Sequence, residues 1–227
     1  MLSLLNLTIT LIDIALLLYV CTAIPSSHRS GQGRSIFLVA LLFGMAYDNL
    51  VVAAGNWFIG EPWFTPVSMM RFYCHVLTLP FLSLFTYSII REAGLALGQS
   101  KVFLMLSLLV TLSTLIYGIS HELVGLQLVE TSQLGIQRMT NANGSAPIAT
   151  IVTNLFTIIL SAYLWRKTGW KVLCLGSMFI FVVNAVAAGK PWGFIAGNLV
   201  EIVFVLSLII THQNITTNRY PAKQVTA

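Results

Sequence analysis

The stretch "SIFLVALLFGMAYDNLVVAA" at residues 35–54 is almost wholly apolar. A transmembrane helix needs about 20 predominantly apolar residues to cross a hydrocarbon core of about 30 Å. The stretch has this length, yet Asp48 and Asn49 stand side by side within it. It therefore predicts a membrane-spanning helix with a carboxyl group that is paired, lines a cavity or takes part in chemistry.

The composition extends this reading to the whole chain. Hydrophobic residues make up 57% of the 227 residues and charged residues only 8%, against about 25% charged residues in an ordinary soluble domain. The mean hydropathy is +0.86. Apolar stretches of this kind lie at residues 2–23, 35–54, 67–90, 102–120, 148–164, 172–188 and 193–211. We expect an all-α polytopic membrane protein, a bundle of seven transmembrane helices that forms a single domain over residues 1–227.

The basic residues predict the orientation of this bundle. The first, third and fifth connections and the C-terminal tail contain Arg29, Arg34, Arg91, Lys101, Arg166, Lys167, Lys171, Arg219 and Lys223. The opposite side has only Arg138 and Lys190, with Arg71 just inside the third stretch. Because Lys and Arg concentrate in cytoplasmic loops, we expect a lumenal or outside N-terminus and a cytoplasmic C-terminus.

Two further observations bear on compartment and partners. Asn143 begins an "NGS" glycosylation pattern in the longest non-cytoplasmic connection, which favours glycosylation and a secretory-pathway membrane, such as the endoplasmic reticulum of a eukaryotic cell. The net charge of +5 reflects the loop bias, since no basic stripe is interleaved with aromatic residues. We expect membrane lipids and a lipid-soluble small molecule as partners and no nucleic acid; the oligomeric state stays open.

Polar residues of the expected helices concentrate at one depth. With this orientation, the outer half of the bundle contains Asp48, Asn49, Arg71, His75, Tyr117, Asn154, Asn184, Asn198 and Glu201. Asp13 lies nearer the middle, and the inner half is expected to be almost purely Leu, Ile, Val and Phe. Polar contacts between helices have no reason to favour one leaflet. The bias therefore predicts a polar pocket on the lumenal side above an apolar floor.

The acidic residues of this layer leave alternatives open. Asp48 is expected within reach of Arg71 or His75, so it either forms a buried ion pair that joins two helices or has a catalytic or ligand-binding role. Glu201 has no cation on its own helix, so a protonated carboxyl that can donate a proton is expected there. The alternative for Glu201 is a hydrogen bond to Asn198 or to a neighbouring helix.

Other residues have supporting roles or a structural explanation. His75 is either a hydrogen-bonded bundle histidine or a ligand-binding residue, and Asp13 is either a third site carboxyl or a partner of a neighbouring Asn. Tyr47, with its π face, is a candidate to stabilise a cation in the pocket. Pro80 is expected to kink the third helix below the site. No metal-ligand spacing is present, so neither a metal nor another cofactor is expected.

A few of these residues resemble a known family. Tyr47 followed by Asp48 in the second helix, and a lone acid, Glu201, in the seventh, resemble the membrane-integral terpene cyclases of fungal and bacterial meroterpenoid biosynthesis. That family has Trp followed by Glu at the first place and Asp at the second. The resemblance implies protonation of a terminal epoxide or alkene on a prenylated substrate and cyclisation through carbocations, as an isomerase or intramolecular lyase of secondary metabolism. Asp48 and Glu201 would be the catalytic pair, with Glu201 favoured as the acid.

Two other functions remain open. An epoxide hydrolase or isomerase on a similar lipid would use the same two carboxyl groups. A transporter or receptor without enzymatic activity would need the Asp48 and Arg71 pair only as a structural link between helices.

Overall fold

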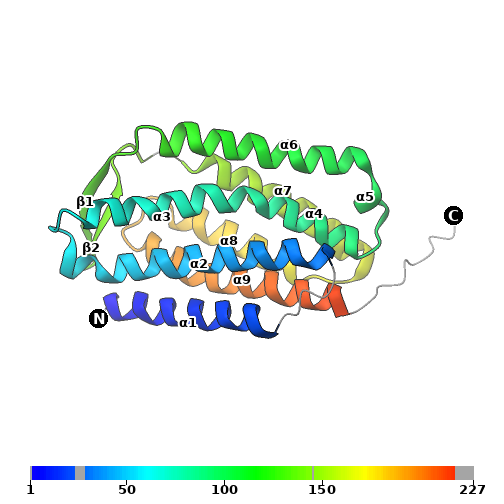
Figure 1. The fold of residues 1–227 in the computed structure, drawn as a ribbon, viewed down its shortest axis with the longest axis horizontal. Coiled ribbons are helices and arrows are strands. Elements are labelled where there is room, and N and C mark those ends of the chain that lie inside the picture. The colour runs from blue at the N-terminus through cyan, green and yellow to red at the C-terminus, as the bar shows by residue number, and fades with distance from the viewer. Residues whose placement is uncertain (1, 24–28, 145, 218–227) are drawn as a thin grey trace.

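The computed structural model describes residues 2–23, 29–144 and 146–217. Arg219 and Lys223, which carried part of the expected charge bias, lie outside the described residues. Figure 1 shows most helices running side by side along the long axis of the molecule, with a small β-hairpin at one end. We call this the hairpin end and the opposite one the far end.

The elements follow the expected apolar stretches closely. The α-helices are α1 (Leu2–Ala23), α2 (Arg29–Phe58), α3 (Phe64–Thr78), α4 (Leu82–Glu92), α5 (Ala96–Gln99), α6 (Lys101–Gly118), α7 (Ile148–Thr168), α8 (Val172–Ala187) and α9 (Gly193–Thr217). A 3-10 turn η1 (Leu79–Phe81), a π-helical turn η2 (Ile119–Leu123) and strands β1 (Leu128–Gln133) and β2 (Ile136–Asn141) complete the described elements.

Six of the described helical segments are long and apolar enough to cross a membrane. They are Ser3–Ala23, Gly31–Phe58, Phe64–Glu92, Lys101–Leu123, Ile148–Thr168 and Gly193–Thr217. The apolar helix α8 has only 16 residues, which at 1.5 Å per residue gives a length of about 24 Å. This architecture is that expected of a multi-pass membrane protein.

The third apolar stretch is interrupted where Pro80 was expected to kink it. α3 ends at Thr78, and Pro80 lies in the one-turn segment η1 before α4 begins. Proline has no backbone N–H, and its ring clashes with the preceding helical turn. The chain therefore passes from α3 into α4 through a single 3-10 turn.

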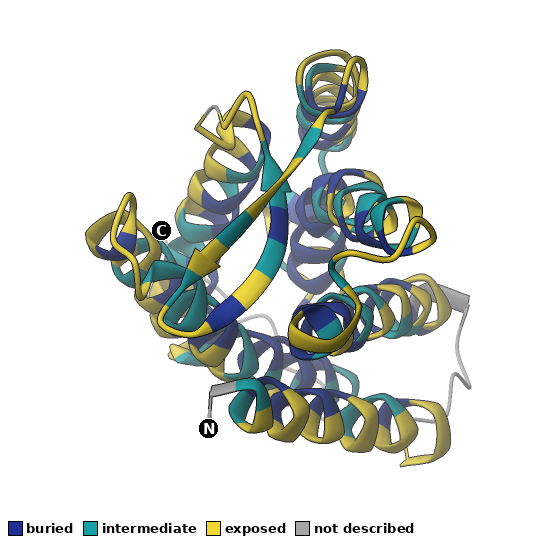
Figure 2. Cartoon of the chain, turned by 90° about the vertical axis from the view of Figure 1, so that its left-hand side faces the viewer, coloured by how far each residue is buried: buried dark blue, intermediate teal, exposed yellow. Residues whose placement is uncertain are grey.

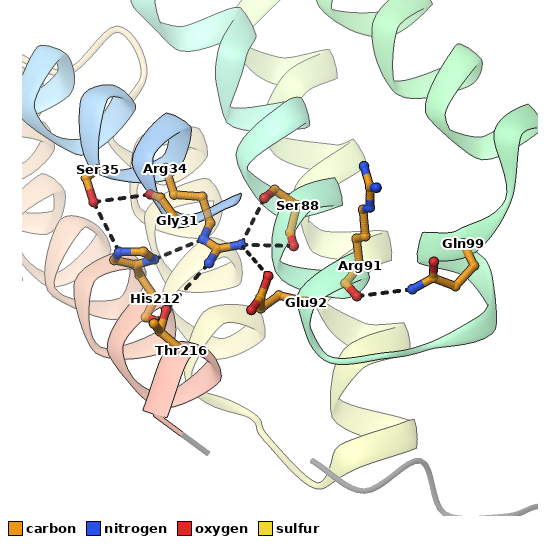
Figure 3. A network of polar contacts seen from close by, with 9 residues as sticks. All are labelled: Gly31, Arg34, Ser35, Ser88, Arg91, Glu92, Gln99, His212 and Thr216. Carbon is orange, nitrogen blue, oxygen red and sulfur yellow. Dashed lines mark hydrogen bonds and ion pairs between the residues drawn. The ribbon is translucent and has the colours of Figure 1, made fainter. Parts of the chain in front are cut away.

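Arg34 corrects one expectation about the far end. It was assigned to a cytoplasmic connection, but α2 already begins at Arg29 and the side chain of Arg34 is only 1% exposed. Its Nε donates to Nδ1 of His212 at 3.0 Å and its Nη1 to Oγ of Ser88 at 2.9 Å, as Figure 3 shows. The expectation that this half is almost purely apolar is therefore wrong, because acceptors on two other helices, α4 and α9, satisfy a buried guanidinium.

The main hydrophobic core also lies toward this end. Side chains of α2, α4, α8 and α9 pack together there, including the fully buried Leu38, Ile89, Leu173 and Leu208. Lipid tails are as apolar as these side chains, so in a membrane the close packing of the helices, rather than the hydrophobic effect, holds them together. The core packs the far-end parts of these helices against one another.

The β-hairpin was not expected; residues 128–141 were assigned to a connection. Leu134 and Gly135 form its two-residue turn, both with positive φ, as tight hairpin turns require. Figure 2 shows the hairpin lying across the end of the bundle. Ile136 and Met139 of β2 are buried, and Met139 packs with Val51 and Phe64, so the hairpin caps this end.

Candidate functional site

A cavity of about 250 Å³ lies within the bundle. Six residues of the expected polar layer line it: Asp48, Arg71, His75, Asn154, Asn184 and Glu201. The structure thus brings together side chains from α2, α3, α7, α8 and α9. The rest of the lining is mostly apolar and comprises Leu41, Gly44, Met45, Leu79, Leu82, Ile180 and Phe204, together with Cys74, Thr78, Thr150 and Thr153.

Asp48 and Arg71 form an ion pair in the cavity wall. Nε of Arg71 donates to Oδ1 of Asp48 at 2.7 Å, and Nη1 of Arg71 donates to the carbonyl of Met139 in the hairpin at 3.2 Å. The side chain of Arg71 is 9% exposed and that of Asp48 is 33% exposed. The expected ion pair is therefore present, and its carboxylate also borders the cavity. A structural role and a role in the site are both open to Asp48.

Glu201 has no such partner. It lines the cavity from α9 and makes no hydrogen bond or ion pair with any described residue. The alternative of a hydrogen bond to Asn198 is not found, because Nδ2 of Asn198 donates instead to Oδ1 of Asn49 at 2.7 Å. A carboxyl without a cation in low-dielectric surroundings favours its neutral form. Glu201 therefore has the surroundings of a proton donor.

A separate buried network lies beside the cavity. Nδ2 of Asn49 donates to Oδ2 of Asp13 at 3.0 Å, and Asn198 joins Asn49 to Asn6. Asn49 and Asn198 were expected in the site, but neither lines the cavity. Asp13 is the partner of a neighbouring Asn, one of its two expected roles. The network joins α1, α2 and α9 and so supports the helix that carries Glu201.

The two tyrosines expected in the site lie outside the cavity. The hydroxyl of Tyr47 donates to the carbonyl of Val67 at 2.8 Å. Tyr117 stacks on His121 with ring centroids 4.1 Å apart. Among the described residues, the aromatic ring that lines the cavity is that of Phe204. Any cation–π contact with a ligand in the cavity would therefore come from Phe204.

His75 and two neighbours on α3 face the same cavity. Nε2 of His75 is 3.2 Å from Oγ1 of Thr150 on α7, so the histidine is hydrogen-bonded and also borders the site. Cys74 and Thr78 were not among the expected residues. Positions 71, 74, 75 and 78 have the spacing of one helix face, and this signal in the sequence could have identified them.

Asn154 offers a free acceptor to the cavity. It is buried on α7, and its Oδ1 accepts no hydrogen bond in the structure. A buried acceptor without a donor costs about 1–3 kcal/mol. A hydroxyl group of a ligand in the cavity would offset that cost, and Asn184 lines the same space from α8. These amides are suited to orient a polar group of a mainly apolar ligand.

A second arginine, Arg138, attaches the hairpin to the bundle. The guanidinium of Arg138 lies over the ring of Phe194 at 4.2 Å, and its Nη2 donates to Oε1 of Gln133 at 3.0 Å. Burial, and then the positive charge of nearby Arg71, lower the pKa of Arg138. Through Arg138 and the carbonyl of Met139, the hairpin is attached to both α9 and α3.

Within the described ranges, no three His, Cys, Asp or Glu side chains gather closely enough to ligate a metal ion. Comparison with known protein families, curated proteins and solved structures finds no match to this chain. The site must be interpreted from its own chemistry. It combines a charge-compensated carboxylate, an unpaired carboxyl and an apolar wall in one cavity.

Proposed function

We propose that this chain is a membrane enzyme that isomerises a lipid-soluble, prenylated substrate by acid–base chemistry, most closely a terpene cyclase of secondary metabolism. The observation that carries the proposal is that Asp48 and Glu201 border one cavity in different electrostatic surroundings. Two titratable groups whose surroundings separate their protonation states are suited to act as acid and base. The resemblance to membrane-integral terpene cyclases points to the same two residues.

The proposed reaction begins with proton transfer from the carboxyl of Glu201 to the oxygen of a terminal epoxide, or to a terminal alkene carbon. The C–O bond or the double bond gives up its electrons, and a positive charge develops on carbon. A second double bond of the prenyl chain then attacks this carbon and closes a ring. The carboxylate of Asp48 stabilises the cation and accepts the proton lost at the end, and proton return to Glu201 completes an isomerisation.

The apolar lining supports this chemistry. Leu41, Leu79, Leu82 and Ile180 surround the space with hydrocarbon, and Phe204 adds an aromatic ring. Such walls accommodate an isoprenoid chain and exclude water, which would otherwise capture the carbocation. The guanidinium of Arg71 donates to the carboxylate of Asp48 at 2.7 Å, so this carboxylate is held in position before the cation forms.

The proposal includes a topology. α8 serves as a seventh crossing, with the hairpin end in the lumen or outside the cell and the far end in the cytoplasm, as the basic residues indicate. Asn143 is exposed just after β2, where a glycosylating enzyme would reach it. A membrane of the secretory pathway is the proposed compartment.

The experiment uses microsomes that contain the protein and a panel of prenylated substrates with terminal epoxides. We expect a product with the mass of the substrate, and the variant Asp48→Asn is expected to abolish its formation at unchanged protein level. A product heavier by one water would identify an epoxide hydrolase instead. Unchanged turnover in Asp48→Asn would overturn the catalytic role of Asp48.

A structural outcome is also distinguishable. If no substrate reacts and Asp48→Asn is lost from the membrane, the ion pair is a structural link, and the non-enzymatic class of receptor or transporter is favoured.

A further inference from the structure

Two residues of the cavity are exposed although they point into the bundle. Asn184 lies two residues from Val182 and from Val186, which are exposed on the outer face of α8. Because successive residues of a helix are about 100° apart, Asn184 points almost the opposite way. His75 has the same relation to the exposed Leu77 on α3. The exposed surface of Asn184 and His75 therefore lies in the cavity that both residues line, where a ligand can contact it.

The cavity lining changes from polar to apolar along the axis of the bundle. α2 and α8 run toward the hairpin end, as Figure 1 shows. On α2, Asp48 is therefore nearer that end than Leu41, and seven residues of helix separate the two by about 10 Å. On α8, Asn184 is likewise nearer the hairpin end than Ile180.

The helices of opposite direction repeat this order. α3, α4 and α9 run away from the hairpin end (Figure 1). His75 of α3 therefore precedes Leu82 of α4, and Glu201 of α9 precedes Phe204, on the way toward the far end. The cavity lining from α7 is polar. The cavity thus has a polar end toward the hairpin and an apolar end toward the core.

The hydrophobic core closes the apolar end. Leu41, Leu82, Ile180 and Phe204 line the cavity and also belong to the main core cluster. Protein cores are close-packed, with few voids larger than a water molecule. A hydrocarbon chain in the apolar end therefore has a limited length.

The cavity volume sets the size of the ligand. A cavity of about 150 Å³ with apolar walls accepts benzene, which has six carbon atoms. The cavity here has a volume of about 250 Å³. In proportion, it accommodates roughly ten carbon atoms, which corresponds to two isoprene units.

The polar end favours an uncharged group of the ligand. Asp48 and Arg71 compensate each other's charge, and the carboxyl of Glu201 is neutral in the proposed function. A charged group of the ligand would thus be buried without a counter-ion, which is costly. Asn184 makes no hydrogen bond with any described residue, and its amide can both donate to and accept from an uncharged oxygen group.

We propose that the cavity binds a ligand of about ten carbon atoms with one uncharged oxygen group, which points toward the hairpin end while the hydrocarbon points toward the core. The chemical class of this ligand rests on the proposed function. In the proposed reaction the oxygen group is the epoxide, and two isoprene units are the fewest that supply both the epoxide and the double bond that closes the ring.

The test measures binding of radiolabelled isoprenoids to the full-length protein in lipid nanodiscs, with empty nanodiscs of the same lipid as the blank. Geraniol, an alcohol of two isoprene units, should bind saturably. Farnesol, an alcohol of three units, should bind at least about tenfold more weakly, because even one extra methylene in a filled apolar pocket has an effect of this size. Myrcene, a hydrocarbon of two units without the hydroxyl, should also bind at least about tenfold more weakly.

Variants at the two ends of the cavity test the orientation. Phe204→Ala lengthens the apolar end, so farnesol should bind to it at least as tightly as geraniol does. Phe179→Ala is the matched control, because it removes the same ring from the outer face of α8, and it should keep the wild-type preference. Asn184→Leu should lower the preference for geraniol over myrcene but keep that over farnesol. If Phe204→Ala does not fold, Ile180→Ala takes its place.

Equal binding of geraniol and farnesol to the wild type, or no saturable binding of geraniol, would overturn the proposal. An unchanged preference in Phe204→Ala, or the same change in Phe179→Ala, would also overturn it. The readout needs no turnover. The expected binding without turnover of any epoxide would refute the proposed function alone, whereas turnover by a protein that binds farnesol as tightly as geraniol would refute the size limit alone.

Discussion

Arg71 holds the carboxylate of Asp48 at 2.7 Å through Nε and the hairpin carbonyl of Met139 at 3.2 Å through Nη1. One guanidinium therefore couples a cavity carboxylate to the element that caps the bundle. Charge compensation of Asp48 and attachment of the hairpin to α3 involve the same side chain.

The first prediction concerns this coupling. Arg71→Met should destabilise the protein by roughly 2 kcal/mol, less than the 3–5 kcal/mol typical when one partner of a fully buried pair is removed, because Asp48 is 33% exposed. The double variant Asp48→Asn with Arg71→Met should recover most of that loss. Thermal unfolding in detergent measures both. Equal stability of the single variant and the wild type would show that the ion pair contributes nothing.

The second prediction concerns attachment of the hairpin to α2. A side chain on Gly55 would collide with the backbone carbonyl of Gln137, where Gln137 also donates its N–H to Oδ1 of Asn56. Gly55→Ala should displace the hairpin and cost about 1–3 kcal/mol, as overpacking does. Limited proteolysis should then cut residues 128–141 faster than in the wild type.

Gly60 provides the control for that experiment, since a side chain there meets no atom within 4 Å. Gly60→Ala should be cleaved at the wild-type rate. Equal cleavage of Gly55→Ala and Gly60→Ala would mean that the hairpin is not held against α2.

The third prediction concerns the cluster at the far end. Arg34→Met removes the donor to His212 and Ser88 and the charge 3.8 Å from Glu92. Leaving buried acceptors unpaired costs about 1–3 kcal/mol, so the unfolding temperature should fall clearly. Arg91 precedes Glu92 in the last turn of α4 (Figure 3), but its side chain is exposed. Arg91→Met should therefore unfold like the wild type, and a similar loss in both variants would contradict a specific role of Arg34.

The positions of the helices could be predicted because hydrophobic length is a strong signal, and Pro80 marked the interruption of the third segment. The hairpin could not, since its strands have the mixed burial of a surface ribbon. Two-residue hairpin turns are usually recognised in a sequence by Asn-Gly or Asp-Gly, but here Leu134 occupies the first turn position. Arg34 was expected in a loop because it is charged. The sequence alone does not show which distant groups will satisfy a buried guanidinium.

The sequence assigned the polar residues a common depth in the expected bundle, but it could not give the direction in which each side chain points. Asp48 and Asn49 share a depth, yet successive residues of a helix point about 100° apart. Asp48 consequently faces the cavity, while Asn49 faces Asp13 and Asn198. Tyr117 likewise shares the depth of the layer but stacks on His121. Helix rotation, which packing between helices decides, separates the cavity residues from their neighbours.

The most direct test of the account is the turnover of a prenylated epoxide by Glu201→Gln in microsomes, compared with the wild type and with the surface control Glu130→Gln at equal protein level. We predict that Glu201→Gln forms the cyclised isomer at least about a hundredfold more slowly, as removal of a general acid does, while Glu130→Gln matches the wild type. Formation of that isomer by Glu201→Gln at the wild-type rate would contradict the assignment of Glu201 as the proton donor.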